Sequence, residues 1–140
     1  MLITLSPVTG EDFQIDESNI FWAEPDGDNV RVFHKQPATD VMQETLVDDT
    51  IDGLNDTSVA AGGTLFGTQI YPNYNKDAGT GDDLIVDVLM NQTYVSQLFD
   101  TSPCEVNYQR GTHSINEIYY HAGDQSSFLA DYNGDFSPSA

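Results

Sequence analysis

The sequence predicts an all-β fold, an antiparallel β-sandwich or barrel of short strands. Three observations support this prediction. Apolar and polar residues alternate in many short segments, turn-forming residues recur about every eight to twelve positions, and the most apolar stretch suits strands better than a helix. With 140 residues the chain is long enough to bury a core as one domain. We expect a single β domain over residues 1–123 and a C-terminal docking tail over 124–140.

The most apolar stretch of the chain predicts two adjacent strands that form a core hairpin. Residues 84–90 are a continuous apolar run broken only by Asp87, and residues 93–99 alternate in part. On a helical wheel the apolar residues point in all directions, and Asn91 and Gln92 fall among them. A buried helix is the alternative interpretation.

The first 35 residues predict a β-meander. Residues 2–5 form a short strand, and the alternation over 13–16 predicts a second strand that pairs back onto it. The turn sequence over 24–29 contains Pro, Gly and three acidic residues, and the alternating segment 30–34 follows as a further strand.

Residues 37–58 leave two interpretations open. Their apolar residues are mostly three to five positions apart, which allows one short amphipathic helix near 41–54 that ends at Gly53. The β-branched residues and the Asp-rich end favour an extended, exposed arm instead. The apolar residues in question are Val41, Leu46, Val47, Ile51 and Leu54.

The second half of the chain adds further short strands. Residues 65–71 predict a strand region that Gly67 interrupts, and residues 72–83 predict a loop. Residues 105–110 and 114–121 both alternate and have a glycine between them, so we expect an antiparallel pair.

The tail keeps bulky apolar residues among small and polar ones. Because such residues in a terminal segment need a surface to cover, we expect the tail to dock on its own domain or on a neighbouring subunit. The candidate interface residues are Phe128, Leu129, Tyr132 and Phe136.

One loop has the beginning of a calcium-binding pattern. Oxygen-bearing side chains stand at the first, third and fifth positions of this loop, but Ala78 and Leu84 replace the Gly and the Glu that an EF-hand requires. A looser calcium site is therefore the candidate for a cofactor. Its ligands would be Asn73, Asn75, Asp77 and Asp82.

Two other patterns are weaker. His113, Glu117 and His121 have a spacing that would share one face of a helix, but the local sequence favours a strand. In a strand, residues four apart lie roughly 13 Å apart and cannot hold one ion. Asn55 and Asn91 begin glycosylation sequons, of which chance alone supplies about one in such a chain.

The sequence carries no recognisable catalytic motif. It has no nucleophile elbow, phosphate-binding loop, dinucleotide fingerprint or zinc spacing, so we expect a protein that is not an enzyme. The lone Cys104 excludes an intrachain disulfide and is expected to be buried. We expect neither a signal peptide nor a membrane-spanning segment.

Charge is the most informative property of the composition. The chain has 23 acidic residues against four Lys and Arg, a formal charge of −19, and Asp outnumbers Glu by 17 to six. Such a surface repels itself, and salt screens the repulsion over roughly 10 Å at about 0.1 M and roughly 3 Å at about 1 M. Direct binding to nucleic acid is not expected, because phosphate contacts need Lys and Arg.

This Asp-rich, Lys-poor composition resembles that of proteins from halophilic archaea and their viruses. With the small size and the β-rich pattern, the resemblance implies a capsid decoration or cement protein of a tailed virus, located in the virion after assembly in the host cytoplasm. Its expected partners are a capsid or other virion protein and further copies of itself. The alternatives are a head-tail adaptor or tail protein, an acidic DNA-mimic inhibitor, and a calcium-dependent adhesive β module.

Overall fold

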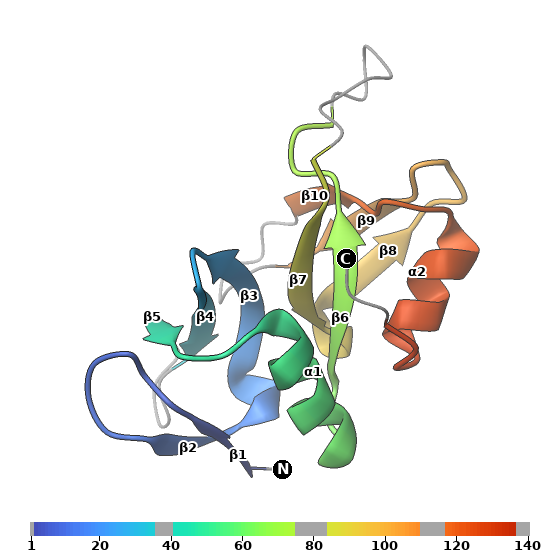
Figure 1. Cartoon of the computed structure of the whole chain (residues 1–140). Coiled ribbons are helices and arrows are strands. Elements are labelled where there is room, and N and C mark those ends of the chain that lie inside the picture. The colour runs from blue at the N-terminus through green and yellow to red at the C-terminus, as the bar shows by residue number, and fades with distance from the viewer. Residues whose placement is uncertain (1, 36–40, 75–83, 110–116, 137–140) are drawn as a thin grey trace.

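The computed structural model describes residues 2–35, 41–74, 84–109 and 117–136, and it confirms the predicted all-β architecture (Figure 1). In this part of the chain the strands form three antiparallel sheets of two, five and three strands. The elements are β1 (Leu2–Leu5), β2 (Phe13–Asp16), β3 (Ile20–Asp26), β4 (Asn29–Lys35), β5 (Met42–Val47), α1 (Ile51–Ala60), β6 (Leu65–Ile70), β7 (Val86–Asn91), β8 (Val95–Leu98), β9 (Glu105–Tyr108), β10 (Glu117–Tyr120) and α2 (Gln125–Tyr132).

The five-stranded sheet has the order β5-β4-β3-β7-β6 and separates two hydrophobic clusters. Side chains alternate between its faces, so that Ala23 of β3 belongs to the first cluster and Trp22 to the second. Helix α1 covers the first face with Ile51 and Leu54. The three-stranded sheet and Phe128 of α2 cover the second face.

The predicted meander is only partly correct. Strands β1 and β2 pair with each other, and β3 and β4 form the expected hairpin. Between β2 and β3 lies a short 3-10 helix (Glu17–Asn19), where Asp16 Oδ1 accepts a hydrogen bond from Ser18 N over 3.1 Å. This turn leads the chain out of one sheet and into another. The first hairpin contacts β5 instead, where Val8 N donates to Leu46 O over 3.0 Å.

The most apolar stretch forms two strands, as predicted, but they do not make a hairpin. Strand β7 pairs with β3 and β6, whereas β8 pairs with β9 in the three-stranded sheet. A 3-10 helix (Gln92–Tyr94) separates them, and Asn91 holds this turn because its Oδ1 accepts from Thr93 N over 2.9 Å. Its Nδ2 donates to Ile20 O over 3.0 Å, so the side chain is anchored to β3. The polar residues thus mark a change of sheet.

Residues 41–60 form a strand and then a short helix, so each of the two interpretations holds for one part of this segment. Strand β5 is an exposed edge over most of its length, as an extended arm would be. Helix α1 begins near Gly53, where the sequence predicted that a helix would end. The reason is Thr50, whose Oγ1 accepts from Gly53 N over 3.0 Å and caps the first turn.

The five- and three-stranded sheets are joined along β6. Tyr71 N donates to Tyr120 O over 2.8 Å, and Ala122 N donates to Gln69 O over 2.9 Å. The segment after β10 therefore extends the edge of the five-stranded sheet, while β10 itself pairs with β9 as predicted. This connection turns the two sheets toward each other and creates the site described next.

Candidate functional site

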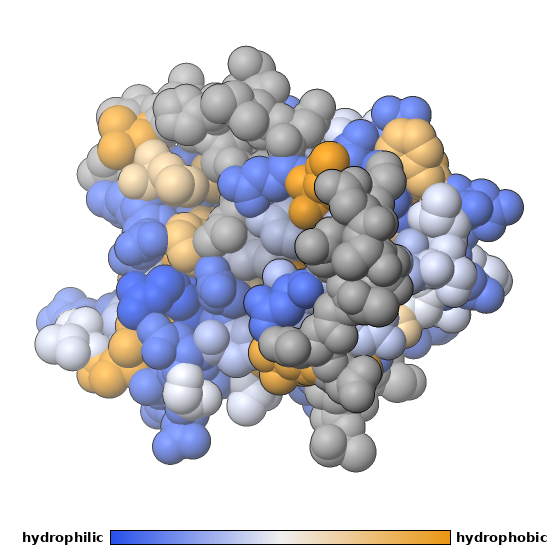
Figure 2. All heavy atoms as spheres, turned by 90° about the horizontal axis from the view of Figure 1, so that it is seen from above, coloured by the Kyte–Doolittle hydropathy of each residue, from blue (hydrophilic) through white to orange (hydrophobic). Residues whose placement is uncertain are grey.

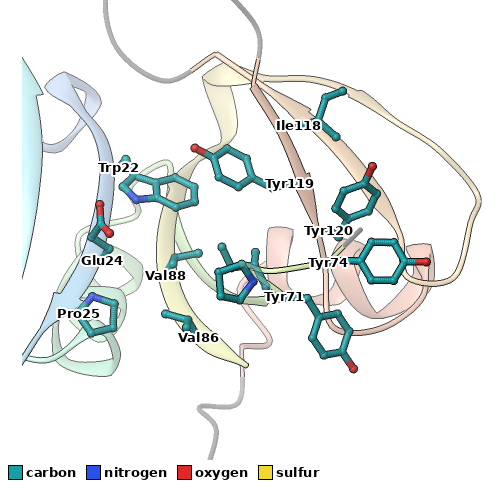
Figure 3. Close-up of a pocket in the computed structure, with 12 residues that line it drawn as sticks. Trp22, Glu24, Pro25, Tyr71, Tyr74, Val86, Val88, Ile118, Tyr119 and Tyr120 are labelled. Atoms are coloured by element: carbon teal, nitrogen blue, oxygen red, sulfur yellow. The ribbon is translucent and has the colours of Figure 1, made fainter. Parts of the chain in front are cut away.

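A groove of about 440 Å³ opens where the five- and three-stranded sheets meet (Figure 3). One wall comes from β3, with Trp22, Glu24 and Pro25, and Val86 and Val88 of β7 lie between the walls. The other wall comes from β10, from the end of β6 and from the residues that follow β6. That wall contains Ile70, Tyr71, Pro72, Tyr74, Ile118, Tyr119 and Tyr120.

The inner end of the groove is a fixed aromatic pair. The rings of Trp22 and Tyr119 are stacked, with centroids 4.6 Å apart and an angle of 23° between their planes. Tyr108 lies behind them, 5.7 Å from Trp22 and fully buried. Its hydroxyl donates to Phe21 O and accepts from Asn91 N over 2.8 Å, so it connects β9 to both β3 and β7. The two walls are therefore held at a defined separation.

The outer end of the groove is a half-buried tyrosine cluster. Tyr74 and Tyr120 are in ring contact at 4.7 Å, and Tyr71 is joined to Tyr120 through the backbone. Ile118, which also lines the groove, is 54% exposed. Figure 3 shows Tyr74 and Tyr120 close together, on the far side of Val86 and Val88 from Glu24 and Pro25. Tyrosine suits such a position because its ring is apolar and its hydroxyl is polar.

The charge at the groove is mixed. Of the described residues that line it, Glu24 alone is charged. Arg31 of β4 lies directly opposite Glu24 in the β3–β4 register, and the hydrogen bond of its Nη2 to Asp26 Oδ2, over 2.6 Å, raises the pKa of Arg31 together with the attraction of Glu44 and Glu24. Pro25 also borders a second hollow of about 530 Å³, on the face of the sheet that carries the first hydrophobic cluster, and its acidic lining residues are Asp28, Asp49, Asp52 and Asp87. From above, hydrophilic residues cover much of the described surface and separate its apolar patches (Figure 2).

The predicted calcium loop falls mostly outside the described residues. Asn73 is exposed at the start of the loop, whereas Asn75, Asp77 and Asp82 lie beyond the described part of the chain. Within that part, no three His, Cys, Asp or Glu side chains are arranged to hold a metal ion. Calcium binding remains a prediction.

The pattern of His113, Glu117 and His121 does not form a site in the described residues. His113 lies outside them, Glu117 is exposed on β10, and His121 is buried. His121 Nδ1 accepts from the backbone of Gly123 over 3.0 Å, so the proton is on Nε2, which lies 3.1 Å from Asp131 Oδ2. The same oxygen accepts from Thr68 over 2.8 Å. This network attaches α2 to the sheet.

Both sequon asparagines are structural. Asn55 is 4% exposed and its Oδ1 accepts from Gly67 N over 2.8 Å, while Asn91 is fully buried. A glycan does not fit at either position in the folded chain. Cys104 is buried as predicted, and burial, more than the nearby carboxylates of Asp100 and Asp124, raises the pKa of its thiol. A raised pKa makes the thiol a poor nucleophile.

The candidate interface residues largely pack against the chain's own core, which is one of the two docking surfaces that the sequence left open. Phe128 is fully buried, in edge contact with Phe66 at 5.7 Å. Tyr132 also contacts Phe66, at 5.2 Å, and Phe136 packs against the first hydrophobic cluster. Of these tail residues, Leu129 is the one with a largely open side chain, 40% exposed. The tail is apolar because α2 has an apolar face to bury.

The sequence prediction missed the groove. Its tyrosines come from segments that are far apart in the chain, and Trp22 comes from a third segment. The available signal was the placement of tyrosines beside loops and at strand ends, where side chains remain accessible. That signal alone does not say which of them meet.

Comparisons with known protein families, with curated proteins and with solved structures gave no match. In the described part of the chain no helix is long and apolar enough to cross a bilayer.

Proposed function

We propose that the chain is a non-enzymatic docking protein that binds a partner protein through the aromatic groove. The groove is the observation that carries this proposal. Tyr and Trp are enriched where proteins meet, and they bind with little loss of conformational freedom. The stacked pair of Trp22 and Tyr119 is already fixed in the free chain. A partner that enters the groove finds a preformed surface.

We further propose that this partner is a component of a virus particle of a halophile. The strongly acidic composition supports this location, because hydrated carboxylates keep a protein soluble in concentrated salt. A capsid decoration or cement protein fits best, since many symmetric copies multiply contacts that are individually weak. A head-tail adaptor or tail protein has the same requirements.

Mass spectrometry and cryo-microscopy of purified particles test the proposal. We expect the chain among the particle proteins, with Ile118 and Tyr119 facing a neighbouring protein. Leu129 on α2 serves as the reference position, because it lies outside the groove lining. Absence from the particles would refute the viral location. A groove that faces solvent in the assembled particle would refute docking through it.

A second candidate function is an acidic DNA-mimic inhibitor, which the hollow beside Pro25 favours. Four aspartates line that hollow, at the β3–β4 turn, at the start of α1 and on β7. Such an arrangement could occupy a basic cleft in a nuclease. Capture of a nuclease that is lost in moderate salt and in the variants Asp28→Asn and Asp52→Asn would support this candidate over the first.

A further inference from the structure

We propose that the groove receives an extended, uncharged segment of the partner protein, which pairs as an added strand with the edge of β10. This inference rests on the proposed docking function and adds the way in which the partner binds. It follows from two properties of the groove. The edge of a strand opens into it, and its lining is mainly apolar and aromatic.

The backbone groups of β10 point alternately to its two sides. In an antiparallel sheet, the N–H and C=O of one residue point to one neighbouring strand, and those of the next residue point to the other. Tyr120 O accepts from Tyr71 N over 2.8 Å, and Ala122 N donates to Gln69 O over 2.9 Å, so Tyr120 and Ala122 point away from β9. Ile118 lies two residues before Tyr120 and therefore also points its N–H and C=O away from β9.

The edge of β10 is open at Ile118 because the chain turns away after β6. Tyr74 N donates to Tyr71 O over 3.5 Å and closes a turn, and Pro72 stands at the second position of this turn, where its fixed φ is favoured. The bonds between the β6 segment and β10 therefore end at Tyr71. Within the described residues, no hydrogen bond reaches the N–H or the C=O of Ile118. Ile118 lines the groove and is 54% exposed, so an incoming chain can reach this edge.

An open strand edge selects an extended backbone. The backbone of an added strand supplies the matching acceptor and donor, and its side chains at alternate positions supply specificity. Side chains opposite Tyr119 would point to the same face as Tyr119, where Trp22, Val86 and Val88 line the groove (Figure 3). Small aliphatic side chains suit these positions. A volume of about 440 Å³ holds a few of them.

The charges favour an uncharged segment from a separate partner. Among the described lining residues Glu24 alone is charged, and Arg31 lies opposite it on β4, so the lining itself selects neither sign of charge. An acidic segment would be repelled by a chain with a formal charge of −19. Two copies of this chain would repel each other for the same reason.

Fluorescence anisotropy with labelled peptides tests the inference on the full chain at about 1 M salt. The probe is a short peptide of alternating valine and threonine with blocked ends. Two matched peptides carry one N-methyl group, on a central valine or on a central threonine, because the amides of these two residue types lie on opposite edges of the extended peptide. We expect one methylated peptide to bind at least about fivefold more weakly and the other to stay within about twofold of the probe.

Matched variants at one position separate the backbone from the side chain. Ile118→Pro removes the outward N–H, whereas Ile118→Ser keeps it and removes the same aliphatic side chain. We expect the Pro variant to bind the probe at least about fivefold more weakly than the Ser variant. Circular dichroism verifies that both variants are folded.

Hydrogen exchange measured by NMR gives a second readout that needs no variant. In the free chain the amide of Ile118 should exchange faster than that of Tyr119, which points to β9. At saturating peptide we expect exchange at Ile118 to slow at least about fivefold.

Several results would overturn the inference. Equal weakening by the two methylated peptides, equal binding to the two Ile118 variants, or unchanged exchange at Ile118 would mean that no strand is added. Absence of binding up to about 1 mM peptide would have the same meaning. A dimer of the free chain that Ile118→Pro dissociates would assign the edge to a second copy. If particles contain the chain with its groove against a neighbour but no extended segment lies along β10, the docking function stands and strand addition fails.

Discussion

Replacement of Tyr108 by Phe tests how the two sheets are held together. The register of β3 and β7 pairs Trp22 with Met90 and Ala23 with Leu89, so Phe21 and Asn91 would be the next pair. The Tyr108 hydroxyl lies between them, accepting from Asn91 N and donating to Phe21 O. The Tyr108 hydroxyl thus extends the hydrogen-bond ladder between β3 and β7 to a position where these strands are not bonded to each other directly.

The expected cost follows from these two bonds. Phe keeps the ring and its contacts with Trp22, but it leaves a buried N–H and a buried carbonyl without this partner. Each such loss costs about 1–3 kcal/mol, and some relaxation of the strands offsets part of it. We expect the free energy of unfolding of Tyr108→Phe to fall by about 2–4 kcal/mol.

Urea unfolding measures this change through the fluorescence of Trp22, the one tryptophan of the chain. Tyr94→Phe is the matched control. Tyr94 packs against Tyr108 at 6.4 Å, but within the described residues its hydroxyl makes no hydrogen bond. We expect the control to change stability by less than about 0.5 kcal/mol. A loss below about 1 kcal/mol in Tyr108→Phe would refute the proposed bridge.

Four further predictions follow from the same structure and sequence. Thr50→Ala should lower the free energy of unfolding by about 1 kcal/mol, because it removes the N-terminal cap of α1. Urea unfolding measures this loss, and the control Thr57→Ala, inside the helix, should not show it. Burial lowers the pKa of His34 below its ordinary value of 6.5, so the unfolded chain binds more protons below that pH. The contribution of neutral His34 to the free energy of unfolding is therefore complete above about pH 6.5 and is lost as the pH falls through the lowered pKa. In this pH range the free energy of unfolding should change more steeply with pH for the unchanged chain than for His34→Gln. The melting temperature should rise between about 0.1 and 3 M salt as repulsion among the acids is screened, and an unchanged melting temperature would contradict salt adaptation. If the predicted calcium loop binds, calcium should raise the melting temperature and Asp77→Asn with Asp82→Asn should abolish the gain, whereas calorimetric titration without heat would dismiss the site.

The features that the sequence predicted correctly are set by neighbouring residues. The β3–β4 hairpin follows from turn chemistry, since Gly27 adopts a φ of 61° that most side chains avoid. The β1–β2 and β9–β10 pairs follow from alternation on both sides of a turn. In each case the identities of a few consecutive residues are enough to predict the strand pair.

The features that it missed are set by distant contacts. Gly67 was expected to interrupt a strand, yet β6 continues through it. A Cβ atom at this position would lie 2.4 Å from Phe136 Cδ2, so the glycine makes room for a residue almost seventy positions later. The partners of β7 and β8 and the meeting of the groove tyrosines have the same origin. Such pairings depend on which faces of the sheets and helices pack together, and the alternation of apolar and polar residues along one segment does not determine this.

The acidic surface and the aromatic groove act over different distances, and this difference fits the docking role that we propose in concentrated salt. At about 1 M salt the attraction between an acidic surface and a basic partner extends only roughly 3 Å, so charge alone selects no partner. Contacts that exclude water keep their strength, and the groove provides apolar and aromatic side chains with which such contacts form. Specificity would then reside in the few side chains between the two sheets, and the remaining carboxylates would keep the chain soluble.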